Sequence, residues 1–286
     1  MRASRHHLFL VSCAAMFVFG LILGLPGTVL AQPDVVTRFG LTLADRGALI
    51  SALFLGLLAG CIVSGPVVHS LGHRATLAWS ALLVAVCLPI LTVASTLFVA
   101  AAALAATGFA TGGINTASNA LASDLFPDDR ARRMNLLAVA FGIGGLTMPT
   151  MTAIGAGFVS WRAIVIGGAA VSLAVVAASL RAGGPRTSNA TVARVSDLLD
   201  LGRSPGFLWL CVLIMLCAAN ESSYAGWIAT YFTASGVAPV TATWLLASHW
   251  GGLVVGRALI AGRIERAKAR AITRGALAGA IAAAMF

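Results

Sequence analysis

Two ionisable side chains lie in stretches that are otherwise almost free of charge, and they are the first candidates for chemistry. Glu221 lies in "LIMLCAANESSYAGWIATYF" (Leu213–Phe232), and His249 lies in "WLLASHWGGLVVG" further along the chain. An acid in the middle of an apolar span costs about 2.5–3.5 kcal/mol on insertion scales, so we expect it to face a cavity or a partner. We predict that Glu221 and His249 share a proton, or that either one holds a substrate hydroxyl. The alternative is a static Glu–His hydrogen bond that locks two helices together.

Polar and aromatic side chains recur at helical spacing in two of the apolar stretches. One set combines Asn115 and Asn119 with nearby hydroxyl residues, and the other comprises Asn220, Tyr224, Trp227 and Tyr231. Residues three or four positions apart share one face of a helix. Amides donate to and accept from hydroxyl groups, and aromatic rings can cover the apolar face of a pyranose. These sets therefore predict binding of a hydroxylated solute, unless the amides serve to bond neighbouring helices together.

The elements that carry these residues are apolar segments long enough to cross a bilayer, for which a helix needs about 20 residues. The chain has 286 residues, of which 59% are hydrophobic and 10% charged, whereas soluble domains carry about 25% charged residues. The sequence therefore indicates a multi-pass membrane protein. The predicted spans are Leu8–Leu30, Ala48–Val68, Thr76–Val93, Leu97–Ala122, Asn135–Val159, Ala163–Leu180, Gly206–Phe232, Thr241–Ala261 and Ala271–Phe286.

The basic residues are distributed unevenly around these spans. With the N-terminus in the cytoplasm, only Arg38, Arg46 and Arg162 of the 19 Lys and Arg residues fall outside. Cytoplasmic loops of membrane proteins are rich in Lys and Arg, so we predict a cytoplasmic N-terminus in the cell (plasma or inner) membrane. The formal net charge of +10 then reflects topology and contact with the lipid bilayer, and we expect no nucleic-acid partner.

The residue types and their spacing do not indicate an enzyme. The five cysteines all lie in predicted spans without metal-ligand spacing, and we interpret them as small buried side chains. The sequence has neither a metalloprotease-type HExxH nor a GxxxxGK[ST] phosphate loop, which would carry metal or nucleotide chemistry. We therefore expect no catalytic residue, no metal and no cofactor, and an ion gradient as the energy source. The oligomeric state stays open.

The spans fall into two sets. We predict a six-helix first half over residues 1–180, a cytoplasmic linker over residues 181–205 with a short surface helix at Val195–Leu201, and a partial second half over residues 206–286. Gly, Pro, Ser and charged residues are typical of such a linker. The last span would rise only about 24 Å as a helix, which is less than the hydrocarbon thickness. We therefore expect the sequence to be truncated after about three helices of the second half.

The loop after the second span resembles the signature G-x-x-x-D-[RK]-x-G-[RK]-[RK] of the major facilitator superfamily. "GPVVHSLGHR" (Gly65–Arg74) matches it at Gly65, Gly72 and Arg74, whereas His69 stands at the acidic position. The resemblance implies an all-α membrane fold of two six-helix halves. It also implies that these three residues form a gating loop, with Arg74 paired to Asp124 at the inner end of the fourth helix.

Within that superfamily, the chain is most similar to the fucose permease-like sugar:proton symporters. The similarity rests on residues Gly112–Pro149, on "NESSYAGWIATYF" and on "HWGGLVVGR". It implies secondary active transport of a small polar solute such as a sugar, coupled to protons or another ion, by alternating access between two helical halves. The acid that such symporters carry in their first helix is missing from Leu8–Leu30. Efflux of a drug or an organic cation, with Glu221 as countercharge, and an inactive truncated remnant are the alternatives.

Overall fold

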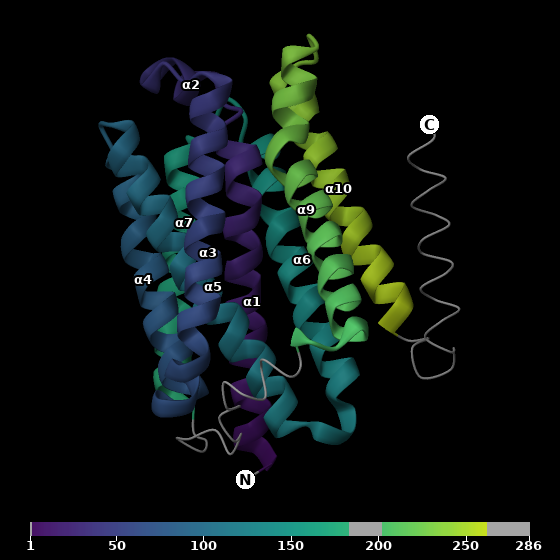
Figure 1. Cartoon of the computed structure of the whole chain (residues 1–286). Helices are drawn as coiled ribbons and strands as arrows, with labels where there is room; N and C mark the ends of the chain where they lie inside the picture. Colours follow the sequence, from purple (N-terminus) through teal and green to yellow (C-terminus); the bar gives the residue numbers. More distant parts are fainter. Residues whose placement is uncertain (1, 183–201, 262–286) are drawn as a thin grey trace.

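The described part of the chain, residues 2–182 and 202–261 of a computed structural model, is a bundle of α-helices (Figure 1). The helices are α1 (Arg2–Val29), α2 (Pro33–Phe39), α3 (Leu43–Leu71), α4 (His73–Val93), α5 (Leu97–Leu125), α6 (Arg130–Ile154), α7 (Trp161–Arg181), α9 (Pro205–Ala234) and α10 (Pro239–Ala261). The long helices run up and down between two ends, with the N-terminus at one end and α2 at the other. The predicted all-α class is confirmed.

Seven helices of the described residues are long and apolar enough to cross a membrane: α1, α3, α4, α5, α6, α7 and α9, with η1 (Pro127–Asp129) continuing into α6. They confirm the first seven predicted spans. The eighth, Thr241–Ala261, forms α10, which is not among these seven. The ninth span, Ala271–Phe286, and the surface helix at Val195–Leu201 lie outside the described residues.

Side-chain caps fix the first turns of three helices that start at the α2 end of the bundle. Thr42 accepts from the Asp45 backbone N–H at 3.2 Å while the Asp45 carboxylate accepts from the Thr42 backbone N–H at 2.9 Å. Thr96 and Ser160 likewise accept from the backbone N–H of the residue three positions later. Such caps satisfy N–H groups that have no partner within the helix, so these residues set where α3, α5 and α7 begin.

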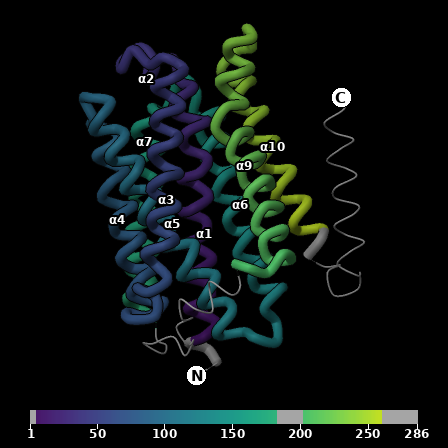
Figure 2. The backbone as a smooth tube through the Cα atoms, in the orientation of Figure 1, coloured from purple at the N-terminus to yellow at the C-terminus, as the bar shows by residue number. Residues whose placement is uncertain are grey.

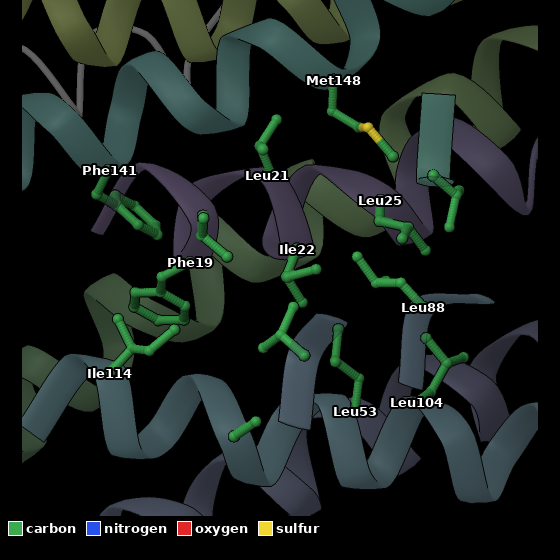
Figure 3. Packing of buried hydrophobic residues seen from close by; sticks show 14 of the residues in the cluster. Phe19, Leu21, Ile22, Leu25, Leu53, Leu88, Leu104, Ile114, Phe141 and Met148 are labelled. Carbon is green, nitrogen blue, oxygen red and sulfur yellow. The ribbon is translucent and has the colours of Figure 1, made fainter. Parts of the chain in front are cut away.

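Helix α1 occupies the centre of the bundle. The most apolar 18-residue stretch of α1 is 72% buried, whereas the corresponding stretch of α9 is not buried at all within the described residues. Figure 3 shows Phe19, Leu21, Ile22 and Leu25 of α1 enclosed by side chains of neighbouring helices, among them Phe141, Met148, Ile114 and Leu53. Helix α3 instead buries Leu53 but exposes Leu55, Leu58 and Ile62. Lipid tails are as apolar as leucine, so a spanning helix can be apolar on both faces.

Glycines let two pairs of helices approach closely. A Cβ atom added to Gly20 would collide with the Phe141 carbonyl of α6, and one added to Gly56 would collide with the Ala105 carbonyl of α5. Gly20 and Gly24 thus let α1 approach α6 closely, and Gly56 and Gly60 let α3 approach α5. By contrast, nothing lies within 4 Å of a Cβ added to Gly252 or Gly256. Figure 2 shows α9 and α10 beside α6 and α1, and this junction carries the ionisable residues.

Candidate functional site

The carboxylate of Glu221 lies beside an arginine of the next helix. Arg257 Nη2 of α10 is 3.5 Å from Glu221 Oε2 of α9, and the two side chains are 31% and 26% exposed. Arg257 Nη1 also donates to the Ala138 carbonyl oxygen of α6 at 3.2 Å. The guanidinium carbon lies 5.7 Å from the centre of the Phe141 ring, within reach of a cation–π interaction. One arginine thus connects α9, α10 and α6.

Arg257 is a site residue that the sequence analysis does not predict, because the charge distribution assigns it to the cytoplasmic side. The signal was present, since Arg257 lies inside the predicted span Thr241–Ala261, and a charge within a span requires a partner. Asn135 of α6 strengthens the junction by donating to the Arg257 carbonyl oxygen at 3.4 Å.

His249 contacts aromatic rings. Its ring stacks on Tyr224 of α9 with 5.5 Å between centroids and 25° between planes. Its Nε2 is buried and has no hydrogen-bond partner among the described residues. Nor does any hydrogen bond or ion pair join Glu221 to His249 in that part of the chain, so a shared proton stays a prediction. The structure does bring Tyr224 and His249 together, one helical turn from Glu221.

An aromatic cluster beside His249 holds α10 against the first helices of the chain. Trp250 is fully buried and meets Phe141 edge-on at 5.6 Å, and Phe141 meets Phe19 of α1 at 4.9 Å. Gly145 of α6 leaves room for the indole, since a Cβ atom there would overlap the Trp250 ring. The backbone that carries His249 is therefore fixed against both α6 and α1.

The structure brings only some of the predicted polar and aromatic residues into contact with one another. On α5, Asn119 Nδ2 donates to both the carbonyl oxygen and Oδ1 of Asn115 at 2.9 Å, so these two amides do form one cluster. On α9, Asn220 and Tyr224 are exposed, while Trp227 is half-buried beside Gly47 of α3. Within residues 2–182 and 202–261, no hydrogen bond or ring contact joins the α5 amides to the α9 set.

The predicted gating loop has its glycine turn. Gly72 joins α3 to α4 with φ 84°, a backbone conformation that favours glycine, whereas Gly65 lies inside α3 with open space beside it. His73 contacts Asp124, with Nε2 3.0 Å from Asp124 Oδ2. The expected partner, Arg74, instead donates from Nη2 to the Leu180 carbonyl oxygen at 2.8 Å.

The family model of the Major Facilitator Superfamily matches residues 9–286. The chain belongs to this superfamily. It is therefore a multi-pass membrane transporter, and the coarse functional class expected from the sequence is confirmed.

Solved structures of transporters share the fold of this superfamily member. A D-xylose-proton symporter is 14% identical with a TM-score of 0.64, covering 91% of this chain and 69% of its own. Tetrameric PepTSo2 is 16% identical with a TM-score of 0.54, covering 96% and 57%. A bacterial homologue of the human drug peptide transporters is 15% identical with a TM-score of 0.54, covering 82% and 53%. No curated protein sequence matches the chain. At these identities, the similarity shows the fold alone.

Proposed function

We propose that this chain transports a small hydroxylated solute, with sugars as the substrate class, coupled to protons across the cell membrane. The two moving bodies are the halves formed by residues 1–180 and 206–286, joined by the linker at residues 181–205. The observation that carries the proposal is the pair of Glu221 with Arg257, which links α9 and α10 of the second half to the Ala138 carbonyl of the first.

This pair gives a proton a way to change the contact between the halves. Protonation of Glu221 removes its negative charge. Arg257 then loses its ionic partner but still donates a hydrogen bond to the Ala138 carbonyl oxygen of α6. A charge left without its partner away from water is costly, and protonation therefore changes the relative stability of the arrangements that α9, α10 and α6 can adopt. A ligand shifts a conformational equilibrium by its differential affinity for the two states, and the proton is such a ligand here.

The substrate contacts we propose lie around this pair. Tyr224 supplies an aromatic ring, Asn220 supplies an amide one residue before Glu221, and Trp227 extends the same helix. Asn115 and Asn119 supply amides from α5 in the first half. His249 stacks on Tyr224, so it can sense an occupied site and take part in proton exchange. The shared fold with a D-xylose-proton symporter supports the sugar class.

Uptake by reconstituted proteoliposomes tests the proposal. An imposed pH gradient should drive accumulation of a labelled sugar from a panel of D-xylose, L-fucose and D-glucose, but not of a cationic dye. Glu221→Gln should lose the gradient-driven accumulation and retain sugar exchange at equal pH on both sides. Asp128→Asn, at an exposed position of η1, is the matched control and should behave as the unmodified chain. Full pH-dependent accumulation by Glu221→Gln would eliminate the coupling role, and transport of the dye alone would favour cation efflux.

A further inference from the structure

A separate small cavity lies at the end of the bundle opposite the N-terminus. It has a volume of about 170 Å³, and its polar and aromatic lining comprises Gln32, Asp34, Thr152, Ser160, Trp161 and Thr243. These residues come from the α1–α2 connection, the start of α2, the end of α6, the N-cap and first residue of α7, and the start of α10. Figure 1 shows this end of the bundle around α2, away from the end that carries the N-terminus.

The side chains around this cavity offer mainly hydrogen-bond acceptors. Thr152 and Thr243 donate their hydroxyl protons to backbone carbonyls of their own helices, at 3.0 and 2.8 Å, which leaves their oxygen lone pairs available. The carboxylate of Asp34 and Oε1 of Gln32 have no hydrogen-bond partner within the described residues. The Ser160 oxygen accepts from the Ala163 N–H at 3.3 Å and so keeps its own proton to donate. A ligand with several hydroxyl groups matches this set.

Charge and size restrict the ligand further. The guanidinium of Arg162 lies 5.4 Å from the centre of the Trp161 ring, so a cation already contacts the aromatic residue that lines the cavity. A neutral polyol is therefore favoured over an ammonium ion. Cavities for drug-sized ligands measure roughly 300–1,000 Å³, and about 170 Å³ suits a molecule no larger than one sugar ring. The Trp161 ring, 8% exposed, supplies the aromatic surface that a sugar ring can cover.

We propose that this cavity is an outer subsite that holds one monosaccharide-sized polyol. The solute then moves on to the central site, which is the proposed substrate site around Glu221 and Arg257. The inference rests on the proposed function for its place in transport, and the positive-inside pattern puts this end of the bundle outside the cell. Thr243 comes from α10, whereas the other five polar and aromatic lining residues come from the part of the chain that precedes the linker. A movement of α10 against α2, α6 and α7 therefore opens or closes the subsite.

Protection of an introduced cysteine tests occupancy without requiring transport. Ala156 lines the cavity, so Ala156→Cys places a thiol there without removing a polar group. Ser235→Cys, on the exposed turn after α9 at the same end, is the matched control. Modification by a membrane-impermeant maleimide is followed by mass spectrometry at each introduced site, with D-xylose, L-fucose or D-glucose present at millimolar concentration.

We expect at least one sugar to slow modification of Ala156→Cys about threefold or more and to leave Ser235→Cys unaffected. Adding Asp34→Asn should abolish that protection, whereas adding Asp128→Asn or Glu221→Gln should preserve it. Persistence in Glu221→Gln separates occupancy of the cavity from an event at the central site.

Absence of protection by every sugar would overturn the proposal, and so would protection by tetramethylammonium alone. Loss of protection in Glu221→Gln with retention in Asp34→Asn would also overturn it, because the effect would then come from the central site. If the proteoliposomes transport no sugar but protection remains, the proposed transport function fails and the subsite stands. If uptake is normal and no sugar protects, the subsite fails alone.

Discussion

Arg257 lies at the centre of the candidate site. A charge in a poorly hydrated environment requires a partner of opposite charge or a hydrogen-bond acceptor. The Arg257 guanidinium reaches Glu221 at 3.5 Å and the Ala138 carbonyl at 3.2 Å. Ion pairs at exposed surfaces contribute little, whereas removal of one partner from a buried pair is strongly destabilising. With side chains that are 31% and 26% exposed, this pair lies between those limits.

Arg257→Gln should therefore lower the free energy of unfolding by about 1–3 kcal/mol, between the exposed and buried extremes. The double variant Glu221→Gln/Arg257→Gln removes both charges and should recover most of that loss. Thermal unfolding of the purified variants in one detergent measures the difference, and the double-mutant cycle isolates the pairwise interaction. Additive effects of the two substitutions would show that the side chains do not interact.

Helices α1, α6 and α10 depend on one another through small residues and one large ring. Gly145 faces the fully buried Trp250, and Gly20 faces the Phe141 carbonyl. Contact between α6 and α10 is also where the proposed halves meet, so packing there bears on movement as well as on stability.

Gly145→Val should destabilise the chain by about 1–3 kcal/mol or more, because overpacking forces neighbouring side chains out of place. The Trp250 ring leaves no space for the added Cβ. Gly252→Val is the matched control, since nothing lies within 4 Å of a Cβ added there and the helical propensity change is the same. Melting temperature and the monodisperse fraction after detergent extraction report the result. Equal losses in the two variants would contradict this assignment of the contact.

At the scale of the whole molecule, the up-and-down path of the helices fixes which loops share a side of the membrane. The turn after α9 lies at the α2 end, and the start of α9 lies at the opposite end, with the N-terminus. The distribution of Lys and Arg predicts that the N-terminal end faces the cytoplasm.

Accessibility of introduced thiols in intact cells checks this orientation. Ser235→Cys should react with an impermeant maleimide from outside, and Gly202→Cys should react only after permeabilisation. Both positions are exposed, so a difference between them reflects their side of the membrane. The reverse pattern would invert the topology and place the proposed outer subsite inside the cell.

The positions of the helices could be predicted from the sequence because the thickness of the bilayer sets the length of each apolar segment. Hydrocarbon thickness demands about 20 apolar residues for each crossing, and seven predicted spans coincide with α1, α3–α7 and α9 to within a few residues at most ends. The shared face of Asn115 and Asn119 could also be predicted, because it depends on spacing within a single helix.

Contacts between helices were decided only by the tertiary structure. His249 and Arg257 are eight residues apart on α10 and so lie near the same face. In the described part of the chain, the packing of α10 on α9 brings Arg257 rather than His249 to Glu221. The same holds for His73, which meets Asp124 one position before the arginine that the signature indicated. The outer cavity draws on five separate segments. Sequence spacing determines which side chains share a face, but the partner they meet depends on how far one packed helix is shifted along another.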